Sequence, residues 1–130
     1  MKKISKIRTT VFLVLILWSI QACYYDDFLP KDDSAEVGTV NFNSDLIPIF
    51  NASCNLSGCH STGGKKPNLS PSNAYTSLIN GGYINKSAPE NSLLYQWMKG
   101  LKGTPMPVSG SNATYNAKVL AWLKQGALND

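Results

Sequence analysis

The sequence predicts an all-α protein, and three observations support this fold class. After residue 43, apolar residues recur at helical spacing in four short segments, near residues 44–51, 70–80, 89–99 and 112–125. Each segment has a residue typical of helix starts or ends beside it. No strand-like alternation of useful length lies between the segments. We therefore expect about four short helices joined by polar connections.

The first 22 residues have the pattern of a bacterial lipoprotein signal peptide. Four basic residues precede a nearly unbroken apolar run at residues 11–20, which is too short to span a membrane comfortably. The run leads to Q-A-C at residues 21–23, which resembles the lipobox of such proteins. We expect lipidation of Cys23 and an outer-membrane lipoprotein that faces the periplasm or the cell surface. The alternative is an ordinary secreted protein with a free Cys23 thiol.

Residues 23–40 are expected to form the lipidated N-terminus and a flexible acidic linker. The segment holds five acidic residues beside Pro30 and Gly38. Fully extended, the 17 residues after Cys23 would reach on the order of 55 to 60 Å from the membrane. Residues 41–130 then remain for a single domain.

The charge distribution argues against binding to nucleic acid. Four of the twelve basic residues lie in the predicted signal peptide, so the mature chain has eight basic and eight acidic residues. No arginine is left, and the lysines are scattered rather than arranged in a stripe. After the linker, seven lysines face three acidic residues. This surplus could steer an acidic redox partner, or it is only solvated surface.

The first helix is expected from about Ser44 to Asn51. Ser44 is a capping residue, and Asp45 follows in the first turn. Apolar residues fill most of the remaining positions, and Pro48 is expected to kink or shorten the helix. The helix leads directly to Cys54.

Cys54, Cys59 and His60 form the motif around which the chain is organised, and His60 is the only histidine. Two cysteines followed at once by a histidine are the layout for covalent attachment of haem c. The usual motif has two residues between the cysteines, whereas this chain has four. Gly58 and its polar neighbours allow the longer segment to bulge, which returns the second thiol to its position.

Two other interpretations use the same residues. Cys54 and Cys59 could form a disulfide in an exported protein, with His60 an ordinary surface residue. A zinc site is disfavoured because the chain has no fourth cysteine and no second histidine to complete a tetrahedral ligand set.

Three further helices are expected after the motif. The second starts at Ser70, with a proline next, and stops at the glycines 81–82. The third covers residues 89–100 and places apolar residues at helical spacing. The fourth runs from Asn112 or Thr114 to a glutamine at position 125.

The loop between the third and fourth helices contains G-T-P-M-P-V at residues 103–108. Three other segments precede this loop in the chain, I-P-I-F, C-x4-C-H and S-L-L-Y-Q-W-M-K-G, and A-W-L-K-Q-G-A follows it. With this pattern, the region from Asp45 to Leu128 resembles a single-haem class I c-type cytochrome with a lengthened attachment motif. The resemblance implies a small domain whose first and last helices cross beside one covalently attached haem.

The resemblance also implies a set of ligands. Cys54 and Cys59 would form the thioether bonds, His60 would be the proximal iron ligand, and Met106 the distal one. Met106 also differs physically from Met98, because a proline on each side stiffens its loop. Met98 lies in a helical pattern, where packing in the core is the expected role of a methionine.

The expected function is therefore electron transfer by a membrane-tethered, His/Met-ligated, mono-haem c-type cytochrome with a redox partner protein. A six-coordinate iron has no vacant position, which predicts that the protein is not an enzyme. One alternative is a haem enzyme or gas-binding protein in which Met106 is displaceable. The other is a haem-free envelope module closed by a Cys54–Cys59 disulfide.

Overall fold

The computed structural model describes residues 37–130. The expected signal peptide (1–22), the lipidation site Cys23 and the linker as far as residue 36 lie outside the described residues. Among the helices that are described, none has the length and apolar character needed to cross a membrane.

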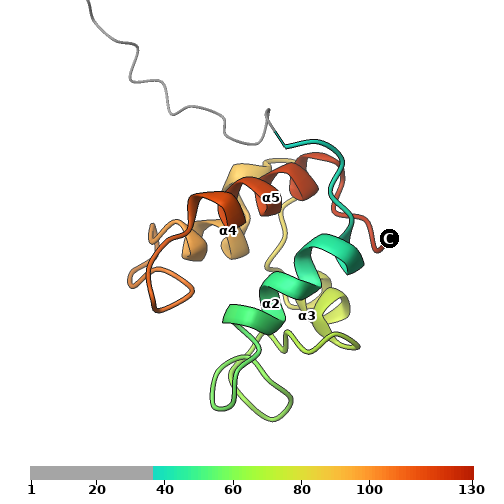
Figure 1. Ribbon diagram of the computed structural model, residues 1–130. Coiled ribbons are helices and arrows are strands. Elements are labelled where there is room, and N and C mark those ends of the chain that lie inside the picture. Colours follow the sequence, from blue (N-terminus) through green and yellow to red (C-terminus); the bar gives the residue numbers. More distant parts are fainter. Residues whose placement is uncertain (1–36) are drawn as a thin grey trace, which may run out of the picture. The chain divides into compact units, whose positions relative to one another are not determined.

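Residues 37–130 are helical and contain no strand, which confirms the all-α prediction for this part of the chain (Figure 1). A π-helical turn, η3, leads into the first α-helix, and a 3₁₀ turn, η4, precedes α4. In chain order the elements are η3 (Phe42–Leu46), α2 (Ile47–Ser53), α3 (Ala74–Asn80), η4 (Pro89–Asn91), α4 (Leu93–Met98) and α5 (Ala113–Lys124).

The first helical segment begins earlier than the sequence predicts, at Phe42 rather than Ser44. Ser44 does not cap it. Instead, the Asp45 carboxylate accepts a hydrogen bond from the backbone N–H of Asn41, at 3.1 Å. The wider π turn ends just before Pro48, which lies in the first turn of α2. A proline there costs no helical hydrogen bond, because the first N–H groups of an α-helix have no partner within the helix.

α3 begins at Ala74, so the start predicted at Ser70 is wrong by one turn. Residues 71–73 form a turn, which the Ala74 N–H closes by donating to the Ser70 carbonyl at 2.9 Å. The Ser70 hydroxyl caps no helix. It donates to the Asn68 side chain at 2.7 Å and accepts a hydrogen bond from the Asn73 side chain at 3.0 Å.

The third predicted helix is interrupted at Ser92. Ser92 is fully buried and has an extended backbone, with ψ of 129°, between η4 and α4. Its hydroxyl accepts a hydrogen bond from the Asn85 N–H at 2.9 Å. The break is therefore stabilised by a partner seven positions earlier, outside the helical segment.

α5 agrees with the prediction at both ends. Asn112 is its N-cap, and the Asn112 side chain accepts a hydrogen bond from the Tyr115 N–H at 3.0 Å. The helix ends at Lys124, one residue before Gln125.

An aromatic cluster joins the first and last helical elements. The ring of Phe42 lies 5.1 Å from that of Trp122, and it makes edge contacts with Tyr75 at 5.3 Å and Phe50 at 6.1 Å. Phe42, Phe50 and Trp122 are almost completely buried. Burial of large aromatic side chains is a major source of stability in a domain of this size.

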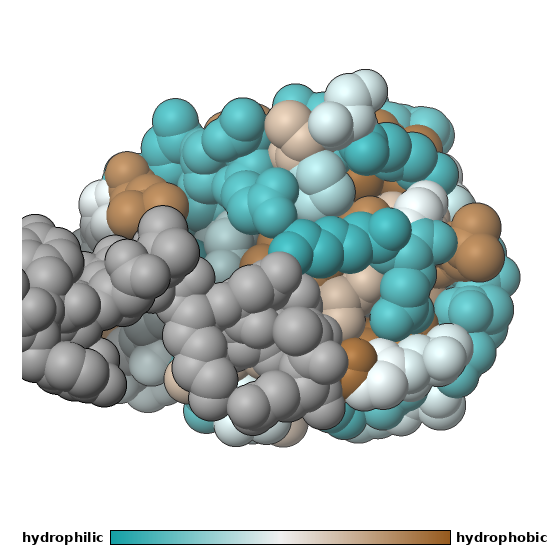
Figure 2. Space-filling model, turned by 90° about the horizontal axis from the view of Figure 1, so that it is seen from above, coloured by the Kyte–Doolittle hydropathy of each residue, from teal (hydrophilic) through white to brown (hydrophobic). Residues whose placement is uncertain are grey.

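The segment after α5 returns to the start of η3. The Asp130 carboxylate accepts hydrogen bonds from the Phe42 N–H at 2.8 Å and from the Asn41 side chain at 3.0 Å, and the Asn43 N–H donates to the Asp130 carbonyl at 2.9 Å. Asp130 thus satisfies the N–H groups of Phe42 and Asn43 at the beginning of the first helical segment. Around this core, hydrophilic side chains cover much of the face seen in Figure 2, and hydrophobic ones lie between them in small groups.

Candidate functional site

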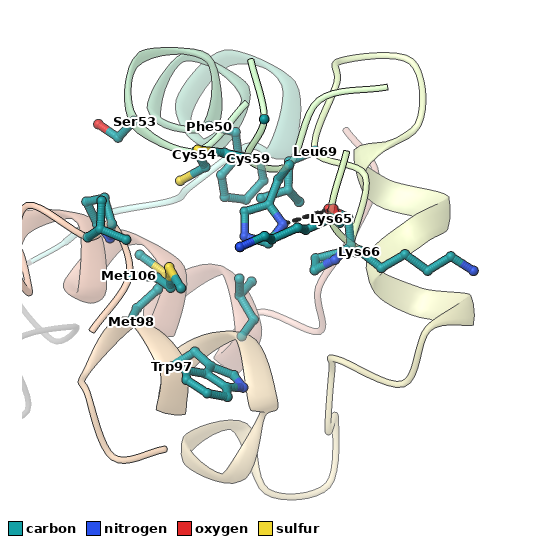
Figure 3. Close-up of a pocket in the computed structure, with 16 residues that line it drawn as sticks. Phe50, Ser53, Cys54, Cys59, Lys65, Lys66, Leu69, Trp97, Met98 and Met106 are labelled. Carbon is teal, nitrogen blue, oxygen red and sulfur yellow. Dashed lines mark hydrogen bonds between the residues drawn. The ribbon is translucent and has the colours of Figure 1, made fainter. Parts of the chain in front are cut away.

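A mainly apolar pocket of about 290 Å³ lies between two parts of the fold (Figure 3). One wall comes from the end of α2 and the loop that follows it. The other wall comes from α4 and the loop before α5. The lining residues are Phe50, Ser53, Cys54, Gly58, Cys59, His60, Lys65, Lys66, Pro67, Leu69, Leu94, Trp97, Met98, Met106, Pro107 and Val108.

The structure brings together all four pocket residues that the sequence predicts: Cys54, Cys59, His60 and Met106. The fifth predicted site residue, Cys23, lies outside the described part of the chain.

The segment from Cys54 to His60 folds back on itself, so the four intervening residues do not separate its ends. The His60 N–H donates to the Cys54 carbonyl at 3.1 Å, and the Cys59 N–H donates to the Leu56 carbonyl at 2.9 Å. Gly58 has a φ of +77°, a conformation that favours glycine. The predicted bulge at Gly58 is therefore confirmed, and it holds both thiols and the imidazole on one wall.

Two backbone carbonyls fix the His60 side chain. Its Nδ1 atom lies 3.0 Å from the Pro67 carbonyl oxygen and 3.2 Å from that of Lys65. Because a carbonyl can only accept, the hydrogen bonds require the proton to be on Nδ1. The Nε2 atom of a neutral imidazole then has a free lone pair. This is the arrangement in which histidine binds a metal, with its other nitrogen donating to a second partner.

The loop at residues 64–69 is itself held by the motif. The Lys65 N–H donates to the Cys59 carbonyl at 2.7 Å, and the Leu69 N–H donates to the His60 carbonyl at 2.7 Å. A Cβ atom at Gly64 would collide with the Cys59 carbonyl oxygen, so this close approach requires glycine. The imidazole is thus oriented by a loop that the motif positions in turn.

Cys54 and Cys59 are free thiols, and both are half-buried. Burial raises the pKa of Cys54 to about 11, and the neighbouring Cys59 thiol adds to the shift. Cys54 is therefore a neutral thiol at physiological pH, whereas metal binding and disulfide exchange require a thiolate. No group of three His, Cys, Asp or Glu side chains within residues 37–130 is arranged to hold a metal ion.

Two methionines lie on the other wall. Met106 is half-buried in its loop, and its N–H donates to the Trp97 carbonyl at 3.0 Å, which fixes the loop against α4. Met98 is 3% exposed and belongs to α4. Figure 3 shows both side chains on the same side of the pocket, across from Cys54.

Met98 lines the pocket as well as the core, whereas its helical pattern predicts only a place in the core. Leu94, Trp97 and Met98 all line the cavity. Their spacing of three and four residues was the signal, since it places them on one face of a helix. What the spacing could not show is that this face borders a cavity as well as the core.

A scan against protein-family models matched no family, and searches of curated proteins and of solved structures returned no match. The function is therefore inferred from the sequence motifs and from the geometry of the pocket.

Proposed function

We propose that the pocket holds one covalently attached haem c and that the protein transfers electrons as a membrane-tethered c-type cytochrome. One observation carries the proposal. The only histidine directly follows the second pocket thiol, and its Nδ1 proton is bound by two carbonyls, which leaves Nε2 available as an iron ligand.

The residues present fit this group. Thioether bonds to the porphyrin need two thiols on one side of the site, and Cys54 and Cys59 meet this need. Imidazole and thioether are both iron ligands in cytochromes of this kind. His60 and Met106 supply them from opposite walls. When bound, haem supplies an iron that cycles between Fe(II) and Fe(III).

The protein residues would control this chemistry in two ways. The Pro67 and Lys65 carbonyls orient His60 and increase its basicity as a ligand. Phe50, Leu69 and Leu94 present apolar surface, which lowers the local polarity and so favours the less charged oxidation state. No step requires a vacant position on the iron, so we do not propose an enzyme.

The membrane tether and the location are part of the same proposal. Lipidation of Cys23 would place the domain in the cell envelope, as an outer-membrane lipoprotein that faces the periplasm or the cell surface. Covalent attachment of haem c also takes place outside the cytoplasm, which agrees with an exported chain. The redox partner would be a protein that meets the domain there.

The test is a pyridine haemochrome spectrum and a redox difference spectrum of the full chain, produced together with haem-attachment machinery. We expect one haem per chain, retained after denaturation. The Cys54→Ala/Cys59→Ala double variant is the matched control and should lose the covalent attachment. A wild-type protein without haem would refute the proposal and favour the disulfide-closed envelope module.

A second candidate is a haem protein that binds a gas or substrate in place of Met106. The observation that favours it is the position of Met106 on a loop rather than a helix, beside Val108, which is 74% exposed. Binding of carbon monoxide to the reduced wild-type protein at neutral pH would support this candidate. Failure to bind would support a permanent Met106 ligand.

A further inference from the structure

The pocket is lined by positively charged side chains but by no carboxylate. Apart from the thiols and His60, the ionisable residues that line it are Lys65 and Lys66, and no acidic residue does. An apolar cavity with cations and no acids at its wall suits an occupant that is apolar over most of its surface and carries anionic groups at one edge.

No carboxylate within residues 37–130 pairs with these two lysines. This part of the chain has three acidic residues, and each has other partners. Asp45 pairs with Lys118 at 2.9 Å and Glu90 with Lys124 at 3.3 Å. Asp130 binds the start of η3.

The side chains of the two lysines point in different directions. Figure 3 shows the Lys65 side chain extending into the pocket, whereas the Lys66 side chain extends away from it. Both main-chain polar groups of Lys65 are also hydrogen-bonded. Its N–H donates to the Cys59 carbonyl at 2.7 Å, and its carbonyl accepts from His60 Nδ1 at 3.2 Å. The ammonium group is therefore carried by a backbone that the motif holds in place.

We propose that the Lys65 ammonium binds a propionate carboxylate of the porphyrin that occupies the pocket. This inference rests on the proposed function, because it presupposes haem. A charge-assisted hydrogen bond at the edge of an apolar cavity is stronger than one in open solvent. It would hold the porphyrin in one orientation and place a positive charge beside it, which favours Fe(II) over Fe(III).

The test uses the full chain with attached haem, without any partner protein. The variants are K65Q, K65R and K66Q, the last being a matched control that removes an adjacent charge pointing away from the pocket. Two quantities are measured for each variant: the midpoint reduction potential at a fixed pH, and the propionate bending band in the resonance Raman spectrum.

We expect K65Q to lower the potential and to shift the propionate band. K65R should keep both near the wild-type values, and K66Q should leave the band unchanged and affect the potential less than K65Q. Lys65 is exposed at the pocket mouth, so the variants should fold and retain haem.

The outcomes separate this inference from the proposed function. A haem-containing K65Q protein with a wild-type propionate band would overturn the role of Lys65 and leave the haem site intact. Equal effects of K65Q and K66Q on the potential would also overturn it, since they would show only a general effect of surface charge. A wild-type chain that acquires no haem would overturn both proposals.

Discussion

His60 has a defined orientation because two main-chain carbonyls lie on one side of its ring. Neither carbonyl comes from a side chain, so the hydrogen bonds from Nδ1 depend on the path of residues 65–67 and not on the identity of a neighbouring polar residue. The one histidine of the chain thus has a fixed tautomer, which a metal ligand needs.

His60→Ala should abolish stable holoprotein, because no second histidine can replace the imidazole. The measurement is the absorbance of haem per chain after purification. Ser53→Ala, which changes another pocket residue without ligand chemistry, is the control and should retain full haem content. A stable, low-spin His60→Ala holoprotein would contradict the assignment.

The two pocket methionines should respond differently to truncation. Met106→Ala should lower the reduction potential and open the iron to carbon monoxide or cyanide, since it would remove the sixth ligand. Met98→Ala should mainly reduce the free energy of unfolding, by about 2 to 5 kcal/mol, because the side chain is buried.

Ligand-binding spectra and chemical denaturation of both variants distinguish these effects. If Met98→Ala opens the iron and Met106→Ala leaves the spectrum unchanged, the assignment of the distal ligand is reversed. The test can give either result, because both side chains line the same pocket.

At the scale of the elements, the four helices could be predicted from apolar spacing, but three of their starts could not. The first segment begins at Phe42 instead of Ser44, and the other two differences are at α3 and α4. The starts at Ala74 and Leu93 depend on Asn68 and Asn85, which bind the serine hydroxyls of residues 70 and 92. Such contacts are decided by where a loop lies in space, and periodicity within a segment contains no information about them.

More of the site than of the helix boundaries could be predicted from the sequence. The thiols, the histidine and the loop methionine follow from motifs, and all four line one pocket. The carbonyls that orient His60 could not be predicted, because every residue has a carbonyl and only the folded path selects two of them. The direction of Lys65 is likewise visible only in the folded chain.

The cap of α5 gives a direct prediction about helix stability. Asn112→Ala should reduce the free energy of unfolding by about 1 kcal/mol, since the Tyr115 N–H loses its acceptor. Asn73 occupies the same position before α3 but makes no capping bond, so Asn73→Ala is the matched control. Urea denaturation should show the smaller loss for Asn73→Ala, and equal losses would contradict the role of the cap.

An ion pair between η3 and α5 should make stability depend on pH. Lys118 and the Asn41 N–H hold the pKa of Asp45 below its usual value. A carboxyl with a lowered pKa in the folded state stabilises the fold above its unfolded pKa of about 3.9, and this contribution is lost as the pH falls below that value.

Asp45→Asn should therefore reduce the free energy of unfolding by about 0.2 to 1 kcal/mol at pH 7 and by less near pH 3. The measurement is urea denaturation of wild type and variant at both pH values. Glu90→Gln removes a more exposed carboxylate, 56% accessible, and serves as the control. A difference between wild type and Asp45→Asn that stays constant with pH would exclude the ion pair as its cause.

For the molecule as a whole, attachment to the membrane should depend on Cys23. Cys23→Ser should release the protein into the soluble fraction, because the acyl chains that hold a lipoprotein on a bilayer could no longer be added. Fractionation followed by a high-salt wash provides the measurement. Persistence of the variant in the membrane fraction would favour an uncleaved signal anchor, and the haem content of the domain should be the same in either case.

The return of Asp130 to the start of η3 determines how late in synthesis the domain can fold. Phe42 packs against Trp122 as well as nearer aromatic rings, and it donates its N–H to Asp130, which comes 88 positions later in the chain. A nascent chain that has emerged only as far as the Cys54–His60 motif lacks both partners, so its first helix has little to pack against. Such a chain would stay open during synthesis. This would suit the proposed transport across a membrane in an unfolded state, and it would leave the thiols accessible before the domain closes around them.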